Sequence, residues 1–309
     1  MSKERSKSAD YAVYLVLRIV VCIVQAFPYR AGRALAGALA WLAYRIDTRH
    51  RAVACKNLQH AFPGHFDDLR LDEFVRKMYR HFCGLVIDII HLPRKLNPNT
   101  WRRHMEIPQI TMVLDCLLSG RPTMLVTGHF GNWELGGYTL ALLGFTPHAI
   151  ARPLDNPYVD DFLRRFREST GQGILAKKGD FDQMQAILAS GGLLATLADQ
   201  DAGQRGLFVD FFGRPASTHK AVALLCMEYQ VPLLVVGVRK LPGELRHQLH
   251  VADLIRPEEY AGKPDAAKAI TQRYTTALEQ IVRASPEQYF WLHRRWKHQP
   301  APKKSRRAA

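Results

Sequence analysis

The segment from His129 to Glu134, HFGNWE, holds the residue types best suited to catalysis in this chain. It follows an apolar run, Thr123–Thr127, through Gly128, which predicts a strand that enters a helix by a glycine-containing turn. Histidine is the natural general base near neutral pH, and a carboxylate on its far ring nitrogen fixes the tautomer and stabilises the imidazolium. We therefore predict that His129 is a general base and that Glu134 orients it.

The spacing limits how these two side chains can meet. Five positions along one helix subtend about 140°, so residues at this spacing do not share a helix face. The pair forms only if His129 lies in the turn and Glu134 folds back from the first helical turn. The alternative is a capping turn, in which Glu134 only complements the positive end of the helix dipole.

Polar residues also follow the other apolar runs, where the carboxyl ends of parallel strands would gather them. Such residues are often solvated loops or structural hydrogen bonds, but several at one sheet edge offer a cation for an oxyanion or a phosphate. A helix that starts at Ser217 or Thr218 would add an anion-binding N-terminus. The expected set is Arg152 for the oxyanion or a phosphate, and Asn132, Asp199, Gln200, Arg214, Ser217 and Thr218 for substrate.

The elements that must position these residues are predicted from hydrophobic periodicity. From residue 122 onward, short apolar runs alternate with helical patterns, which predicts an α/β fold with a mixed, mainly parallel sheet flanked by helices. Upstream, 34–60 and 66–92 are each predicted to be a helix. Strands are expected at 123–127, 148–151, 193–198, 208–212, 233–238 and 249–252, and helices at 132–143, 157–170, 180–190, 218–229 and 265–284.

An apolar segment, Tyr11–Phe27, follows a basic start and is interrupted only by Arg18. As a helix of ~1.5 Å per residue it reaches about 25 Å, short of a hydrocarbon core of ~30 Å. Three interpretations stay open: a marginal transmembrane anchor, a helix that lies in the bilayer interface, and a buried core helix. The arginines that follow place the bulk of the protein on the cytoplasmic side. Residues 1–30 are expected to be the basic start and membrane-anchor helix, and 299–309 a basic flexible tail.

The composition excludes several classes of protein. Hydrophobic residues make up 47% and charged residues 23%, which excludes collagen-like, coiled-coil and wholly disordered chains. The 43 Lys and Arg against 28 Asp and Glu give a net charge of +15, which favours anionic partners. The five cysteines form no CxxC pair, so neither a disulfide framework nor a zinc site is expected. The sequence has no phosphate-binding loop, serine elbow or HExxH motif.

Several segments occur in a characteristic order. They are HFGNWE, ARPLDNP (Ala151–Pro157), LADQD (Leu197–Asp201), GLFVDFFGRPASTH (Gly206–His219) and YFWLHRRWK (Tyr289–Lys297), with NLQHAFP (Asn57–Pro63) further upstream. In this combination the chain resembles, over nearly its whole length, the late acyltransferases of lipid A biosynthesis, the lauroyl and myristoyl transferases of Gram-negative bacteria. Asp210 departs from that pattern, which more often has proline there.

That family belongs to the glycerolipid acyltransferase superfamily, whose signature is His-x4-Asp/Glu. The resemblance implies that His129 takes a proton from the acceptor hydroxyl, that Glu134 orients it, and that Arg152 stabilises the oxyanion or holds a phosphate. It places Asp199 in a second acidic block. It also implies acyl carrier protein as the acyl donor, a lipid A precursor as the acceptor, and no metal or other cofactor.

We therefore expect a membrane-associated O-acyltransferase at the bacterial inner membrane, with its acyltransferase domain (31–298) on the cytoplasmic face. Its expected partners are acyl carrier protein, an anionic glycolipid and the membrane surface, and no nucleic acid. One alternative is an acyltransferase that acts on another glycolipid or an aminolipid. Another is a non-enzymatic basic membrane-binding protein, which would leave HFGNWE unexplained.

Overall fold

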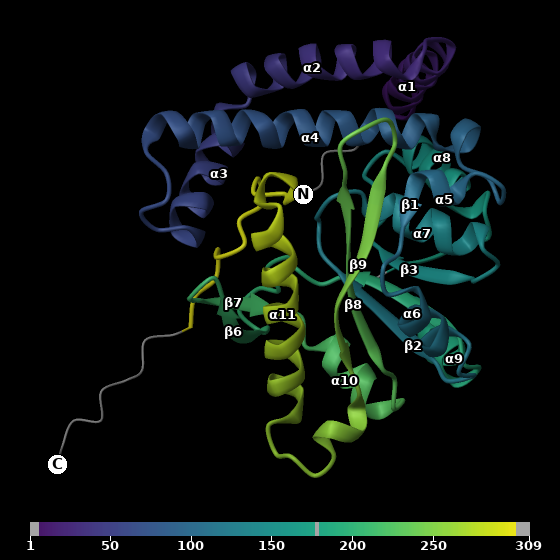
Figure 1. The fold of residues 1–309 in the computed structure, drawn as a ribbon, viewed down its shortest axis with the longest axis vertical. Helices are drawn as coiled ribbons and strands as arrows, with labels where there is room; N and C mark the ends of the chain where they lie inside the picture. The colour runs from purple at the N-terminus through teal and green to yellow at the C-terminus, as the bar shows by residue number, and fades with distance from the viewer. Residues whose placement is uncertain (1–5, 177–178, 301–309) are drawn as a thin grey trace.

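The computed structural model describes residues 6–176 and 179–300, and they form a central sheet with helices on both faces (Figure 1). The strands are β1 (Met105–Glu106), β2 (Thr123–Thr127), β3 (Pro147–Ala151), β4 (Gly173–Ala176), β5 (Leu193–Leu197), β6 (Leu207–Phe211), β7 (Arg214–Thr218), β8 (Leu233–Lys240) and β9 (His247–Ile255). The helices are α1 (Lys7–Ala26), α2 (Tyr29–Ile46), α3 (Thr48–Ala61), α4 (Asp68–Lys95), α5 (Trp101–His104), α6 (Ile110–Leu117), α7 (Trp133–Leu142), α8 (Pro157–Glu168), α9 (Phe181–Ala189), α10 (Ala221–Glu228) and α11 (Ala266–Ala284), with the 3-10 turns η1 (Pro257–Tyr260) and η2 (Pro286–Gln288).

The central sheet has seven strands in the order β1-β9-β8-β2-β5-β3-β4. Its pairs are parallel except β8 with β9, which is antiparallel. The prediction of an α/β fold with a mixed, mainly parallel sheet is therefore confirmed. Because successive side chains of a strand point to opposite faces, Met124 and Val126 join one core cluster and Leu125 joins the other. The first cluster contains residues of α9, α10 and α11, and the second contains residues of α6 and α7.

One predicted helix is two helices in the structure. The stretch 34–60 is divided at Asp47, where α2 ends and α3 begins. The Asp47 carboxylate accepts a hydrogen bond from the backbone N–H of His50, which caps the start of α3. The continuous apolar periodicity of the sequence concealed this cap, so the prediction of a single helix was wrong.

The predictions also missed three strands, β1, β4 and β7, and one predicted strand belongs to another sheet. The run 208–212 corresponds to β6, which pairs with β7 in a separate two-stranded antiparallel sheet. The sequence of β7, RPAST, resembles a loop, but an edge strand tolerates Pro215 because its missing N–H is not needed there. The two-residue β1 and the four-residue β4 are too short to show a periodicity.

Helix α4 crosses the top of the molecule in Figure 1, with α2 lying along it and α1 beside one end. It comes close to the predicted catalytic turn, because the His81 side chain lies 3.4 Å from the carbonyl oxygen of Gly131. The ring of Phe82 lies 6.4 Å from Trp133 and 5.1 Å from Phe290. Helix α4 thus separates the catalytic turn from α1 and α2.

Candidate active site

His129 and Asp199 lie next to each other at one edge of the sheet. Strands β2 and β5 are parallel neighbours, and Thr127 pairs with Leu197 at their carboxyl ends. His129 and Asp199 each follow two residues later. The topology therefore brings together two side chains that are 70 positions apart in the sequence, at the edge where α/β proteins commonly place their sites.

The Asp199 carboxylate accepts two hydrogen bonds from His129. One oxygen lies 2.8 Å from the ring Nδ1 and the other lies 2.8 Å from the backbone nitrogen. Because a carboxylate accepts, Nδ1 carries the proton and Nε2 keeps its lone pair. Gln200 donates from its side-chain nitrogen toward that Nε2 at 3.4 Å, which agrees with the same tautomer. The His129 side chain is 22% exposed and the Asp199 side chain only 2%, so a reactant can reach the imidazole but not the carboxylate.

The electrostatics of the pair favour a charged imidazolium. Burial alone would lower the pKa of His129, but the Asp199 carboxylate outweighs burial, so the pKa of His129 is raised above its ordinary value. Burial alone would raise the pKa of Asp199, but the adjoining His129 holds that pKa well below its usual range. The carboxylate therefore stays ionised and stabilises the imidazolium that forms when His129 accepts a proton.

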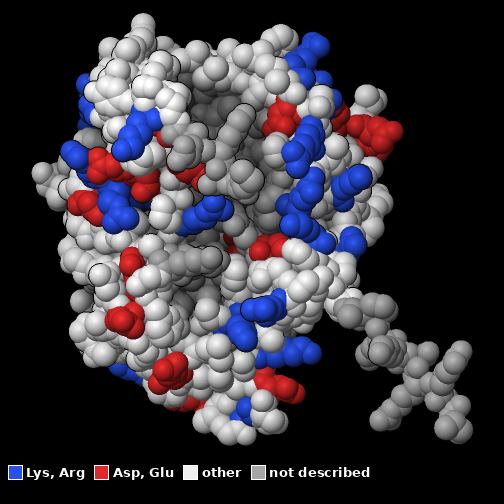
Figure 2. Space-filling model, turned by 180° about the vertical axis from the view of Figure 1, so that it is seen from behind, with Lys and Arg blue, Asp and Glu red and all other residues white. Residues whose placement is uncertain are grey.

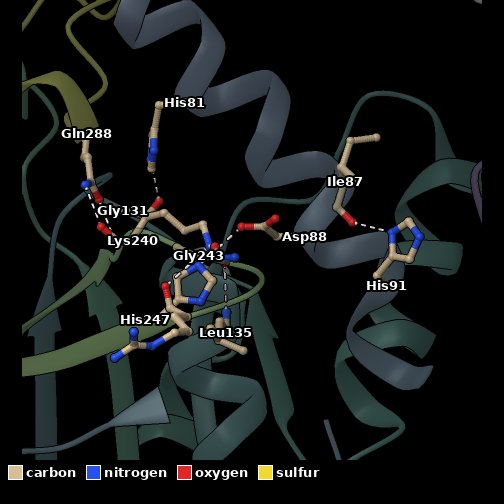
Figure 3. A network of polar contacts seen from close by, with 12 residues as sticks. His81, Ile87, Asp88, His91, Gly131, Leu135, Lys240, Gly243, His247 and Gln288 are labelled. Carbon is tan, nitrogen blue, oxygen red and sulfur yellow. Dashed lines mark hydrogen bonds and ion pairs between the residues drawn. The ribbon is translucent and has the colours of Figure 1, made fainter. Parts of the chain in front are cut away.

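The turn between β2 and α7 requires glycine at position 131. Gly131 has φ +57, and a Cβ on it would lie 1.8 Å from the carbonyl oxygen of Val238. Its N–H donates to Gln288 O, and the N–H of Asn132 donates to Val238 O. Figure 3 shows His81 pointing toward Gly131 and Gln288 bound to the backbone of Lys240. Burial lowers the pKa of His81 to about 4, so it donates from Nε2 as a neutral ring.

A second buried network centres on Asp88 of α4, which Figure 3 shows near Lys240 and His247. The Asp88 carboxylate accepts a hydrogen bond from the Tyr29 hydroxyl at 2.7 Å and lies 3.3 Å from Nε2 of His247. Arg33 of α2 lies 3.7 Å from the same carboxylate. These contacts attach α2 and β9 to α4, and β9 in turn pairs with β8, which holds the catalytic turn.

Glu134 does not make the predicted hydrogen bond with His129. Its carboxylate binds Arg167 of α8 through two contacts, Oε2 to Nε at 2.9 Å and Oε1 to Nη2 at 2.5 Å, and accepts from Trp133 Nε1 at 3.2 Å. The Asn132 side chain accepts from Leu135 N and starts α7 at Trp133, so Glu134 is directed toward α8. Glu134 remains near enough to contribute to the raised pKa of His129, but less than Asp199 does.

Arg152 lies at the surface, away from the pair. Its side chain is 83% exposed and lies 3.4 Å from Asp155. Among the described residues, no hydrogen bond or ion pair joins it to His129. It lines a small cavity of about 80 Å³ together with Arg164 and Arg167. Arg167 in turn binds Glu134.

Three of the remaining predicted substrate residues, Asn132, Ser217 and Thr218, are buried and hydrogen-bonded within the fold. Ser217 and Thr218 are fully buried inside β7, where both hydroxyls donate to backbone carbonyls, and α10 begins only at Ala221. The prediction of an anion-binding helix start at these residues is therefore wrong, because the polar segment continues the small sheet. Asn132 is buried as the cap of α7, and Arg214 starts β7.

The sequence reasoning missed residues of the C-terminal segment that wall the site. The N–H of Phe290 donates to His129 O at 3.0 Å, and the rings of Phe290 and His293 lie 6.2 and 6.5 Å from the His129 ring. Asn57 of α3 holds this segment by donating to Trp291 O and His293 O at 2.8 and 2.9 Å. The motif YFWLHRRWK marks this segment in the sequence but indicates no role for it, and no sequence signal singles out Arg167.

Two further observations bear on chemistry and location. Within residues 6–176 and 179–300, no cluster of three or more His, Cys, Asp or Glu side chains could hold a metal ion. One helix in the same ranges, α1, is long and apolar enough to cross a membrane by length and composition, and 11% of its most apolar window is buried.

Comparison with known proteins gives a consistent result. Residues 1–298 match the family model described as bacterial lipid A biosynthesis acyltransferase. The chain is 26% identical over 286 residues to the lipid A biosynthesis lauroyltransferase of Escherichia coli, covering 91% of this chain and 90% of that one. It is 24% identical to the lipid A biosynthesis palmitoleoyltransferase of the same organism, over 83% and 82% of the two chains. A phosphatidylinositol mannoside acyltransferase of Mycobacterium tuberculosis is 28% identical over 58% of this chain and 56% of its own.

Proposed function

Because the chain belongs to the family of bacterial lipid A biosynthesis acyltransferases, we propose that it transfers a fatty acyl chain from acyl carrier protein to a hydroxyl of a lipid A precursor. The observation that supports this most is the His129–Asp199 pair, with Nδ1 bound to a buried carboxylate and Nε2 free to accept a proton. This is the arrangement that a general base requires.

In the proposed reaction His129 acts directly on the acceptor. Its Nε2 takes the hydroxyl proton while the hydroxyl oxygen attacks the thioester carbonyl carbon. The tetrahedral intermediate then collapses as the C–S bond breaks, and the imidazolium returns the proton to the departing thiolate. Asp199 stabilises the imidazolium between these two proton transfers.

The oxyanion of that intermediate needs a donor close to Nε2. Gln200 is the described side chain placed for this, because its amide nitrogen lies 3.4 Å from His129 Nε2 and its side chain is exposed. Gln200 was predicted as a substrate residue, and we propose that its N–H turns to the oxyanion when substrate is bound. Glu134 and Arg167 support the turn from the other side as a partly buried ion pair.

The partners follow from charge. The net charge of +15 suits an acidic carrier protein and a phosphorylated acceptor. Figure 2 shows Lys and Arg on both sides of the face seen from behind, with Asp and Glu lying among them. With the apolar α1, these charges support our proposal of an enzyme at the cytoplasmic face of the inner membrane.

The proposal is tested with purified full-length protein in detergent micelles. Acyl carrier protein loaded with a labelled acyl chain is mixed with a lipid A precursor, and the product is analysed by mass spectrometry. We expect a mass gain of one acyl chain on the acceptor, and much slower transfer from the matching coenzyme A thioester. Absence of the product from either donor would refute the proposed function.

A phosphatidylinositol mannoside is the second acceptor to test, since a mannoside acyltransferase is among the relatives. It enters the same assay as a competitor at equal concentration. Preferential acylation of the mannoside would keep the reaction type and replace the acceptor.

A further inference from the structure

The exposed apolar side chains are concentrated in the first two helices. Of the 20 exposed large hydrophobic residues among those described, 13 lie between Tyr11 and Ile46. The same stretch contains four arginines and neither Asp nor Glu. A contiguous apolar surface with positive charge alone matches an anionic bilayer better than it matches water.

Helix α1 contacts the body of the protein at both of its ends. Near its start, Asn156, the N-cap of α8, donates to Asp10 O at 2.9 Å, and near its end Gln25 donates to Ile90 O of α4 at 3.1 Å. Between these contacts Arg18 lies over the Phe162 ring of α8 at 5.1 Å. A 20-residue helix is about 30 Å long, the thickness of a hydrocarbon core. If α1 spanned the membrane, its two ends would lie on opposite sides of the bilayer. The rest of the protein, which lies on one side, could not then contact both ends.

Helix α2 presents a second apolar face. Its Gly32, Ala36 and Ala40 are buried, and Tyr29 hydrogen-bonds to Asp88 of α4. On its other side Leu35, Leu39, Leu42 and Ile46 are exposed at spacings of four, three and four, which form one helical stripe. In Figure 1 α2 runs along the outer side of α4 and α1 is seen nearly end-on at its side, so the two helices together cover this end of the molecule.

We propose that α1 and α2 form one interfacial platform (residues 11–46) that lies in the headgroup region of an anionic phospholipid bilayer, with α1 flat on the membrane rather than across it. This deepens the proposed function, because it assigns the membrane contact of the same enzyme. Only α4 separates the platform from the turn that carries His129, a layer of about 10 Å. The proposed base therefore lies one helix layer from the membrane surface.

The first test asks on which side the start of α1 lies. Ser8→Cys and Ser190→Cys are made separately in a Cys22→Ala background, since Cys22 is an exposed cysteine of α1. Ser8 precedes the platform, and Ser190 follows α9 on the opposite part of the body; both are exposed. Each variant is treated with a membrane-impermeant maleimide in inverted inner-membrane vesicles and in intact spheroplasts, with the parent as the blank.

A flat α1 predicts that the two cysteines are labelled from the same side, here in inverted vesicles and not in spheroplasts. Labelling of Ser8→Cys in spheroplasts while Ser190→Cys stays unlabelled would overturn the proposal. If both cysteine variants are labelled only in spheroplasts, α1 still lies flat on the membrane. That result would refute the cytoplasmic location in the proposed function.

The second test concerns α2. Leu39→Glu combined with Leu42→Glu removes apolar contact from the platform, whereas Leu69→Glu changes a leucine that is 85% exposed outside it. We expect the double variant to bind vesicles of phosphatidylglycerol and phosphatidylcholine at least tenfold more weakly than the wild type, and Leu69→Glu to bind as the wild type does. Equal binding of both variants would overturn the role of α2. Acyl transfer in micelles should be the same in all three proteins, which separates membrane docking from catalysis.

Discussion

Replacement of Asp199 by Asn isolates the contribution of the buried carboxylate. The amide fits the same space. Its oxygen can still accept the hydrogen bond from the backbone N–H of His129, which in the wild type goes to the Asp199 carboxylate at 2.8 Å. Its NH₂ group would then face Nδ1, where Asp199 accepts at 2.8 Å. To receive that donor, the ring must move its proton to Nε2, which removes the lone pair that the reaction needs.

The size of the effect follows from the loss of the correct tautomer and of the charge that stabilises the imidazolium. The same exchange in a serine protease triad lowers kcat by about 10⁴-fold, and we expect a similar loss here, equivalent to about 5 kcal/mol of transition-state stabilisation. Burial remains while the anion is gone, so the pKa of His129 should fall below its ordinary value of ~6.5.

The assay is acyl transfer in micelles from pH 5 to 9, with Asp201→Asn as the matched control. Asp201 lies in the same LADQD segment, but its carboxylate binds His298 at 2.6 Å instead of His129. We expect the control to keep its rate within a few-fold. A rate for Asp199→Asn equal to that of Asp201→Asn, with both proteins folded, would refute the assigned role of the carboxylate.

Three further outcomes follow. In the wild type, the raised pKa of His129 places the acidic limb of the kcat/KM profile above pH ~6.5. Activity rises with pH through this limb because the base must be neutral to accept a proton. An acidic limb at lower pH in the wild type than in Asp199→Asn would contradict the direction of this pKa shift. Glu134→Gln breaks a partly buried, charge-assisted pair with Arg167, so calorimetry should show a loss of about 1–3 kcal/mol in the free energy of unfolding. The transfer rate should fall less than with Asp199→Asn. A larger fall in rate without a change in stability would instead assign Glu134 as the acid that orients His129. Arg152→Lys should leave kcat and the free energy of unfolding unchanged, since the side chain is 83% exposed. It should raise KM for the phosphorylated acceptor, because lysine keeps the charge but not the planar guanidinium. An unchanged KM would exclude phosphate recognition by this residue.

The strands and most of the helices around the site could be predicted, because their apolar runs are regular. The run Thr123–Thr127 coincides with β2, and His129 follows it as expected. The break at Asp47 and the strand β7 were missed, since a cap and a polar edge strand depend on neighbours more than on periodicity.

The partner of His129 was misassigned for a different reason. Glu134 is near in the sequence, whereas Asp199 becomes a neighbour only because β5 pairs with β2, and a pattern of strands does not give their order. Asp199 was predicted as a polar residue at a strand end, so the carboxylate that binds His129 was in the candidate set, but as a substrate residue and not as the partner of His129. Arg167 could not be found, because nothing in an amphipathic helix indicates which arginine meets a distant glutamate.

The central claim is that the His129 imidazole takes the proton of the acceptor hydroxyl. Single-turnover acyl transfer by His129→Ala, with enzyme in excess over acyl carrier protein, measures that step apart from product release. We predict a fall of about 10²–10⁴-fold in the transfer rate, with acyl carrier protein still bound and the protein still folded. Transfer by His129→Ala at the wild-type rate would contradict the account.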